Sequence, residues 1–171
     1  MVLFKTASVV VVRLSKLADY GLVLMACLAR GRDTEPQRTA RGLASQSKLP
    51  LPTVSRLLKQ LSQNGLLVSQ RGNQGGYSLA KEPGDITLLE IVAAVEGPVA
   101  LTECSTGISG SCDLETCCTI KNNQRLISQI VRGALENITV LDLIQPLKLT
   151  TIKNARGQLV PITGMMSGRV Q

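Results

Sequence analysis

A run of helical patterns followed by a glycine-rich hairpin constrains the fold of this 171-residue chain more than any other feature. Apolar side chains recur at helical spacing over residues 14–30, which predicts a first helix with a broad buried face. A short helix capped by Thr39 is expected over 40–46, and a third helix over 52–64, opened by Pro52 and ended by Gly65. Extended runs at 66–70 and 77–79 flank a glycine-rich turn. This order predicts a mainly α fold with a small β-hairpin wing, the winged helix-turn-helix.

The same periodicity predicts which side chains form the core. The first helix is expected to bury one face, the second helix a pair of side chains and the third helix four. These residues are Leu14, Leu17, Ala18, Gly21, Leu24, Met25, Leu28, Leu43, Ala44, Val54, Leu57, Leu58 and Leu61. The core is almost wholly aliphatic, since Phe4, Tyr20 and Tyr77 are the only aromatic residues. Base stacking on aromatic platforms, as in single-strand binding proteins, is therefore disfavoured.

Positive charge is confined to the half of the chain that carries the helix-turn-helix pattern. The net charge is +7 overall. Residues 1–81 hold twelve Lys and Arg against three acids, or +9, whereas residues 82–171 hold seven against nine, or −2. A basic surface is usually no more than a solvated face, but its confinement to one half favours contact with a polyanion.

The exposed side of the third helix is the candidate surface for reading double-stranded DNA. Arg56 has the chemistry to read guanine edges, and Lys59 suits phosphate. In the hairpin, Arg71 stands next to a glycine and can approach the DNA backbone. The alternative is that these side chains are only the solvated face of an amphipathic helix. The predicted DNA-binding residues are Thr53, Ser55, Arg56, Lys59, Gln60 and Arg71.

Four of the five cysteines, Cys104, Cys112, Cys117 and Cys118, fall within fifteen residues of a Gly- and Ser-containing loop. Such bunching indicates a ligand set rather than core residues or a disulfide framework. Zinc remains an alternative, but its closely spaced chelating pairs are missing, and uneven spacing suits iron–sulfur clusters better. A metal-free thiol switch is the third alternative. Cys27 lies among apolar residues of the first helix and is expected to be buried.

Two further helices are expected downstream of the hairpin. Thr87 followed by Glu90 is a capping-box pattern that opens a fourth helix over 88–95. A fifth helix is expected over 121–138, with an apolar stripe that begins at Ile127 and ends at Ile138. This stripe either packs within the same subunit or pairs with its copy in a two-fold dimer, and the dimer is preferred because a small domain offers little to cover it.

Several stretches resemble the IscR-type (Rrf-two) winged-helix transcriptional regulators, and within them the regulators of the SUF iron–sulfur cluster assembly operon in proteobacteria. They are RLSKLADYG at 13–21, LPTVSRLLKQL at 51–61, RGNQGGY at 71–77, and residues 86–92 and 95–98. The resemblance covers residues 13–145. It implies a homodimer that binds a palindromic operator and controls SUF genes according to iron–sulfur status.

The resemblance also implies that Cys104, Cys112 and Cys118 bind an iron–sulfur cluster, [2Fe–2S] in preference to [4Fe–4S]. The family completes the ligand set with a histidine, but this chain has no histidine. Glu103, Asp113, Glu115, Cys117, a partner subunit or an exogenous group would have to supply the fourth ligand.

The expected organisation is an N-terminal extension (1–12), a DNA-binding region (13–82), a linker helix and cysteine loop (83–118), a dimerisation helix (119–145) and a flexible tail (146–171). No segment has the length of a membrane span, and free thiols suggest the cytosol. An enzyme is not expected, because neither a histidine base nor a phosphate loop nor a carboxylate pair stands out. Two alternatives are a zinc- or thiol-sensing regulator and a cluster carrier that does not bind DNA.

Overall fold

The computed structural model describes residues 14–34, 37–72, 75–106, 108, 110–114, 116–145, 151–153 and 159–161. The expected N-terminal extension, residues 1–12, lies outside this part of the chain, as do Asn73, Gln74 and Glu115. No helix among the described residues is long and apolar enough to cross a membrane.

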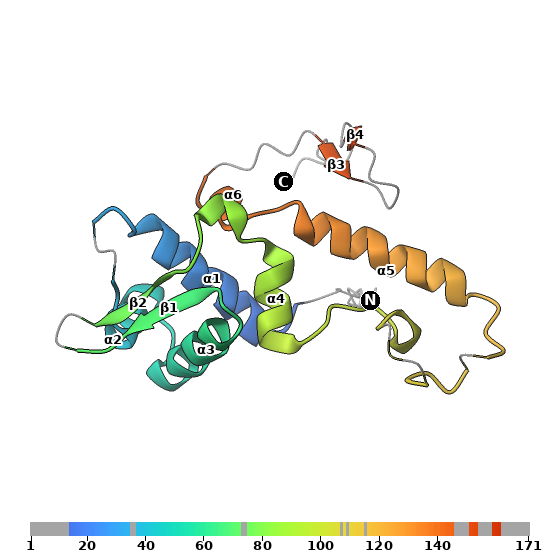
Figure 1. Ribbon diagram of the computed structural model, residues 1–171, viewed down its shortest axis with the longest axis horizontal. Helices are drawn as coiled ribbons and strands as arrows, with labels where there is room; N and C mark the ends of the chain where they lie inside the picture. The colour runs from blue at the N-terminus through green and yellow to red at the C-terminus, as the bar shows by residue number, and fades with distance from the viewer. Residues whose placement is uncertain are drawn as a thin grey trace, which may run out of the picture.

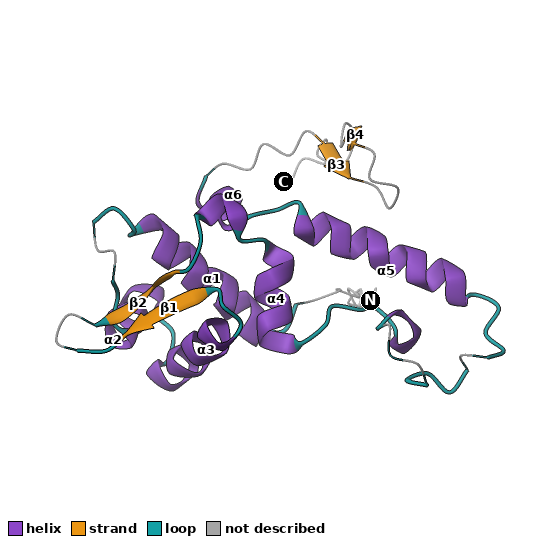
Figure 2. Ribbon diagram, in the orientation of Figure 1, coloured by secondary structure: helices purple, strands orange, loops and turns teal. Residues whose placement is uncertain are grey.

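The fold is mainly helical with a two-stranded wing, as the sequence predicts (Figures 1 and 2). The predicted helices and hairpin form within about two residues of the expected bounds, while two 3₁₀ turns, α6 and the β3–β4 pair were not expected. The elements are α1 (Lys16–Arg30), α2 (Ala40–Ser47), α3 (Leu51–Gln63), β1 (Leu67–Gln70), β2 (Gly76–Leu79), η1 (Pro83–Asp85), α4 (Leu88–Glu96), η2 (Glu103–Ser105), α5 (Lys121–Glu136), α6 (Val140–Ile144), β3 (Thr151–Lys153) and β4 (Leu159–Pro161).

Side chains cap the helices where the sequence places them. The Thr39 hydroxyl accepts a hydrogen bond from the backbone N–H of Gly42 and opens α2. Thr87 and Glu90 form the predicted capping box of α4. Burial raises the pKa of Glu90, but hydrogen bonds from Thr87 and from Lys81 outweigh it and bring the pKa below its ordinary value. The start of α4 is therefore fixed by groups that the sequence pattern identified.

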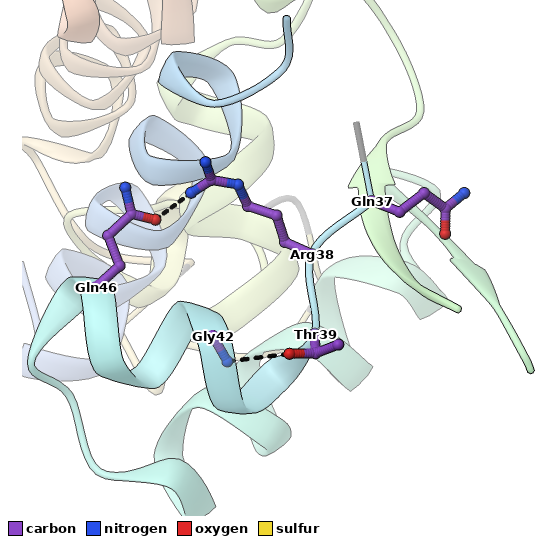
Figure 3. Close-up of a pocket in the computed structure, with 5 residues that line it drawn as sticks. All are labelled: Gln37, Arg38, Thr39, Gly42 and Gln46. Carbon is purple, nitrogen blue, oxygen red and sulfur yellow. Dashed lines mark hydrogen bonds between the residues drawn. The ribbon is translucent and has the colours of Figure 1, made fainter. Parts of the chain in front are cut away.

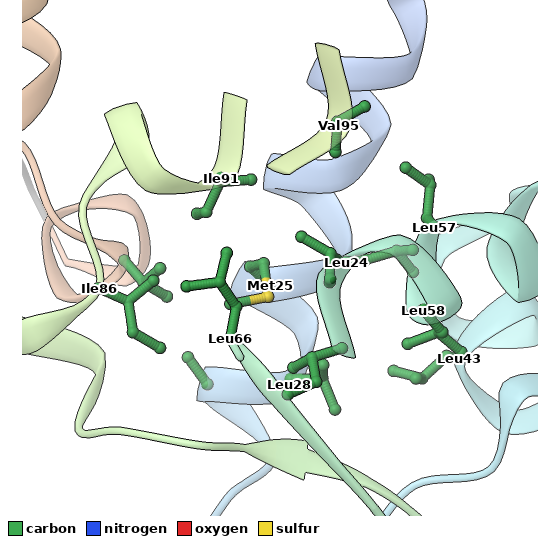
Figure 4. Packing of buried hydrophobic residues seen from close by; sticks show 14 of the residues in the cluster. Leu24, Met25, Leu28, Leu43, Leu57, Leu58, Leu66, Ile86, Ile91 and Val95 are labelled. Atoms are coloured by element: carbon green, nitrogen blue, oxygen red, sulfur yellow. The ribbon is translucent and has the colours of Figure 1, made fainter. Parts of the chain in front are cut away.

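The hydrophobic core lies between α1, α3 and α4 (Figure 4). The side chains predicted for α3 are fully buried, and Leu24, Met25 and Leu43 join them. Leu14 departs from the prediction, because it precedes α1 and is 42% exposed. Val140 of α6 and Ile86 complete the core, joined by a hydrogen bond from the Val140 N–H to the Ile86 carbonyl. The end of the α5–α6 segment therefore returns to the DNA-binding half.

The wing is an antiparallel pair in which Leu67 lies opposite Leu79 and Gln70 opposite Gly76. Arg38 adds a third backbone segment through two hydrogen bonds with Tyr77. A Cβ atom on Gly76 would lie 2.8 Å from the backbone of Arg38, which explains why glycine occupies this position. The wing is thus joined by backbone contacts to the segment that leads into α2.

Helix α5 stands apart from the core, with α4 between it and the helices α1 and α3 (Figure 1). It ends at Glu136, two residues before the predicted Ile138. The first part of its apolar stripe is open to solvent in the single chain, since Ile127 is 47% and Ile130 43% exposed, while Val131, Ala134 and Leu135 are half-buried. Ser128 is the one α5 residue that is buried.

The strands β3 and β4 pair antiparallel within the segment that the sequence assigned to a flexible tail. Thr151 lies opposite Pro161, and Lys153 opposite Leu159. Six residues of this segment therefore have regular structure that the sequence pattern does not predict. The flexibility of the rest stays a prediction.

Replacing Leu58 with Ala should lower the free energy of unfolding by about 3 kcal/mol, because it leaves a cavity in a fully buried site. The same replacement at Leu51, on the same helix but 39% exposed, should cost less than about 1 kcal/mol. Urea unfolding at one fixed protein concentration measures both. Equal losses in the two variants would contradict the described core.

Candidate nucleic-acid interface and cysteine loop

The outward face of α3 presents the basic and hydroxyl side chains that the sequence singled out. Ser55, Arg56 and Lys59 are exposed, and Thr53 is half-buried. They alternate along α3 with the four apolar side chains that fill the core. Because the apolar face is packed against the core, the polar face must point outward. The result is an exposed helix face with two positive charges and two hydroxyl groups.

Gln60 does not belong to this outward face. Its side-chain nitrogen donates to the backbone carbonyl of Val95 at 3.5 Å, and Asn64 makes a parallel contact with the Ala94 carbonyl at 3.3 Å. The side-chain oxygen of Gln60 is buried. Gln60 therefore joins α3 to α4 instead of facing a DNA groove, a contact that helix periodicity alone could not reveal.

The wing carries Arg71 on its exposed tip, directly after β1. Gly72 has φ +120°, a conformation that other residues rarely adopt. A Cβ atom on Gly75 would lie 2.4 Å from the carbonyl oxygen of Gln70. The turn depends on these glycines, and it presents Arg71 to solvent as the sequence predicts.

A hollow of about 480 Å³ beside the start of α2 is lined by Gln37, Arg38, Thr39, Gly42 and Gln46 (Figure 3). The Arg38 guanidinium lies over Gly31, where a Cβ atom would collide with it, and donates to the side-chain oxygen of Gln46. Arg38 was not predicted from the sequence, because it acts through contacts between segments that are far apart in the chain. It bonds to Tyr77 of the wing and to Gln46 of α2, and it lies over Gly31 at the end of α1. A glycine just after α1 was the only local signal.

The four clustered cysteines lie on one irregular segment between α4 and α5. Cys104 is buried on η2, Cys112 and Cys118 are half-buried, and Cys117 is exposed. Hydrogen bonds within the segment hold it: Ser111 Oγ donates to the Glu103 carbonyl at 2.8 Å and joins the parts that carry Cys112 and Cys104, and the Cys118 N–H donates to the Leu114 carbonyl at 2.9 Å within one turn.

The thiols have the right chemistry for a metal cluster, but the described loop does not assemble them. Among the described residues, no three His, Cys, Asp or Glu side chains lie close enough together to hold a metal ion. The predicted set of Cys104, Cys112 and Cys118 is thus not gathered around one point. Cys117 and Cys118 share one turn that begins at Leu114, whereas Cys104 lies on η2 against α5, so nearness in the sequence does not bring the three thiols together.

Two polar contacts attach the beginning of the cysteine loop to α5. Arg125 Nε donates to the Cys104 carbonyl at 2.9 Å, and the Leu101 N–H donates to the Ser128 hydroxyl at 3.3 Å. Ser128 is only 2% exposed, so its hydroxyl group is largely withdrawn from water. The segment around Cys104 is therefore bound to the helix that carries the open apolar stripe.

Cys27 lies on α1, half-buried and packed against the core. Burial raises the pKa of its thiol, while the nearby Arg30 and Arg38 act in the opposite direction. A thiol with a raised pKa is mostly protonated and a poor nucleophile. Cys27 packs as the small apolar side chain that was expected, although it is not completely buried.

The structure combines a core between α1, α3 and α4, a helix α3 whose exposed face carries basic side chains, and a two-stranded wing whose turn requires glycines. This combination defines a winged helix-turn-helix DNA-binding protein. The model of the Rrf2 family, described as an iron-dependent transcriptional regulator, matches residues 14–146. The chain belongs to this family and is a DNA-binding transcriptional regulator rather than an enzyme. Membership in a family of transcriptional regulators speaks against the alternative of a cluster carrier without a DNA-binding role.

Curated relatives include regulators named HTH-type transcriptional regulator IscR. That of Klebsiella pneumoniae subsp. pneumoniae is 29% identical over 146 residues, which cover 85% of this chain and 88% of the relative. That of Enterobacter sp. is 31% identical over 132 residues and covers 77% of this chain and 79% of the relative. The resemblance to IscR-type regulators is therefore confirmed at the family level.

Solved structures support the same fold. CymR of B. subtilis, the global cysteine regulator, has a TM-score of 0.62 at 27% identity, covering 78% of this chain and 97% of CymR. T. potens IscR gives 0.59 at 26% identity, covering 77% and 85%. The oxidized form of Staphylococcus aureus CymR gives 0.56 at 25% identity, covering 78% and 96%. The structurally similar proteins thus include a cysteine regulator as well as an IscR.

Replacing Lys59 with Ala should reduce the slope of log affinity against log salt concentration by about 1 for duplex DNA, because one phosphate contact and its released counterion are lost. Fluorescence anisotropy over a series of NaCl concentrations measures this slope. The charge-matched variant Lys121→Ala, on α5, should leave the slope unchanged. Equal slopes for the wild type and Lys59→Ala would show that Lys59 does not contact a DNA phosphate.

Proposed function

We propose that this regulator senses iron–sulfur cluster status through its cysteine loop and controls SUF iron–sulfur assembly genes. The observation that carries the proposal is the set of four cysteines within fifteen residues, attached to α5 in a chain of a family described as iron-dependent. Cys104, Cys112 and Cys118 are the proposed ligands, and [2Fe–2S] is the proposed cluster. The fourth ligand would come from Glu103, Asp113, Glu115, Cys117, a partner subunit or an exogenous group.

The described loop must rearrange before it can hold a cluster, since no three of its described Cys, Asp or Glu side chains come together. Such a rearrangement is local, because the loop is held by a few hydrogen bonds within itself and to α5 rather than by the core. It would act first on the contacts of Leu101 and Cys104 with α5. A change that starts at the cysteines therefore has a direct physical connection to α5.

DNA recognition is proposed to use Thr53, Ser55, Arg56 and Lys59 of α3, with Arg71 of the wing. Arg56 and Lys59 are exposed on the helix face opposite the core. Gln60 is removed from the set because of its contact with Val95. An α3 that enters the major groove would place Arg56 for base edges and Lys59 for phosphate.

A homodimer through α5 is proposed as the form that reads a palindromic operator. The exposed stripe on α5 includes Leu126, Ile127 and Ile130. Such a stripe on a helix that the core does not cover favours pairing with its copy. Two α3 helices related by a two-fold axis would then meet two half-sites.

A redox-sensing thiol switch is the second candidate function. It is favoured by the exposure of Cys117 next to Cys118 and by structural similarity to a CymR solved in an oxidized form. In this case the loop would respond to oxidants without holding a metal. Zinc binding is a third outcome that the same analysis would detect.

Replacing Cys104, Cys112 or Cys118 singly with Ala should remove the visible absorption bands and most bound iron and sulfide from protein purified without oxygen, since each change deletes a cluster ligand. The same variants should lose the difference in operator affinity between cluster-containing and metal-free protein. Absorption spectra, iron, sulfide and zinc analysis, and gel shift assays provide the readouts.

Cys27→Ala is the matched control and should keep the bands and the bound iron, because Cys27 lies on α1 and outside the cysteine loop. Cys117→Ala tests the fourth ligand, and it keeps the cluster if another group supplies that ligand. Loss of the cluster in Cys117→Ala would instead identify Cys117 as the fourth ligand. Wild-type protein that is colourless and holds no iron would contradict the cluster proposal. Zinc in that protein would support zinc sensing, whereas an affinity change on oxidation alone would support the thiol switch.

Replacing Ile130 with Glu should raise the dimer dissociation constant by at least about tenfold, because it places an unpaired charge in the proposed α5 interface. Sedimentation equilibrium measures the change. Val68→Glu, which introduces the same charge at an exposed apolar residue of β1, should leave the dimer intact. A dimer of unchanged stability in Ile130→Glu would exclude the α5 stripe as the interface.

A further inference from the structure

The two ends of the wing are supported in different ways. At the base, Leu67 lies opposite Leu79, and both side chains pack against the core. The three residues of β1 that follow Leu67 are exposed, so this strand loses apolar support towards the tip. A two-stranded hairpin is only marginally stable in water when nothing else holds it. The position of the tip, and of Arg71 on it, therefore needs support beyond the packing of the base.

The backbone of Arg38 supplies such support. Its N–H donates to the Tyr77 carbonyl at 3.0 Å, and its carbonyl accepts from the Tyr77 N–H at 2.8 Å. Gly76 precedes Tyr77 and pairs with Gln70, the last residue of β1 before Arg71. A Cβ atom on Gly76 would lie 2.8 Å from the Arg38 backbone, so the two backbones are in close contact. Arg38 thus supports the wing directly beside the turn that carries Arg71.

The side chain of Arg38 fixes this support to two helices. The guanidinium donates to the side-chain oxygen of Gln46, in the last turn of α2 (Figure 3). It also lies over Gly31, where α1 ends, and would collide with a Cβ atom there. The backbone of Gly31 has φ −97°, which any residue adopts. The space that the guanidinium occupies is therefore the reason that glycine suits this position.

We propose that Arg38 is a positioning residue for DNA recognition. By holding β2 to the ends of α1 and α2, it sets the position of Arg71 relative to the exposed face of α3, so that both reach the same duplex. The guanidinium acts through Gln46 and Gly31 and not as a phosphate ligand. This inference rests on the proposed role of Arg71 in DNA binding.

The test uses two substitutions that leave the charge of the protein unchanged. Gln46→Ala removes the acceptor of the guanidinium, and Gly76→Ala pushes the wing away from the Arg38 backbone. Each should lower the slope of log affinity against log salt concentration for duplex DNA by about 1, because the phosphate contact of Arg71 is lost with the position of the wing. Arg71→Ala should lower the slope equally in the wild type and have no further effect in either variant. Fluorescence anisotropy over a series of NaCl concentrations measures all five proteins.

Gly84→Ala is the control for an added methyl group. Its Cβ atom would lie 3.7 Å from its nearest neighbour, a methyl group of Leu141, and the slope should match the wild type. Hydrogen exchange gives a second readout on the same proteins. The Tyr77 amide should exchange faster in Gln46→Ala and Gly76→Ala, whereas the amide of the buried Leu58 should stay protected, which shows that the fold is intact.

An unchanged slope in Gln46→Ala or in Gly76→Ala would overturn the inference, provided that Arg71→Ala lowers the slope. A further loss on adding Arg71→Ala to either variant would also overturn it, because the wing would then still deliver Arg71 to the DNA. A wild-type slope in Arg71→Ala would instead contradict the proposed role of Arg71. The Tyr77 amide then decides separately whether Arg38 holds the wing, and unchanged exchange in both variants would show that it does not.

Discussion

The packing of α1, α3 and α4 against one another is the constraint on which the rest of the molecule depends. Leu24, Leu57, Leu58 and Ile91 fill the space between these helices and exclude water from it. A Cβ atom on Gly21 would lie only 3.3 Å from a methyl group of Val95, so a small residue there lets α1 and α4 approach closely. Because one face of α3 is fixed by this core, the direction of its exposed face is fixed as well.

The same core anchors elements that lie far away in the sequence. The segment around Ile86 and Leu88 exchanges backbone hydrogen bonds with Ile138 and Val140. This contact fixes the C-terminal end of α5 next to the DNA-binding half. The other end of α5 leads back to the cysteine loop, whose η2 turn contacts α5 again. Helix α5 thus connects the cysteines to the core that orients α3.

The cysteine loop contrasts with this core in how it is held. Short turns with hydroxyl-to-carbonyl hydrogen bonds replace apolar packing, and Cys104 alone among its four thiols is buried. Local hydrogen bonds between exposed groups contribute little net stability, because water competes for the same donors and acceptors. The conformation of the loop therefore costs less to change than that of the core, whereas its contact with α5 at Ser128 is buried.

Local sequence determined most of the secondary structure and core. Helical spacing identified Leu57, Leu58 and Leu61, and a Thr-to-Glu spacing of three residues identified the cap of α4, because these signals act within a few residues. Only tertiary structure decided that Gln60 faces Val95, that Arg38 joins the wing to α2, and that α6 returns to the core. It also decided that no three of the clustered cysteines come together within the described chain. These outcomes depend on how distant segments pack, which periodicity along one segment does not encode.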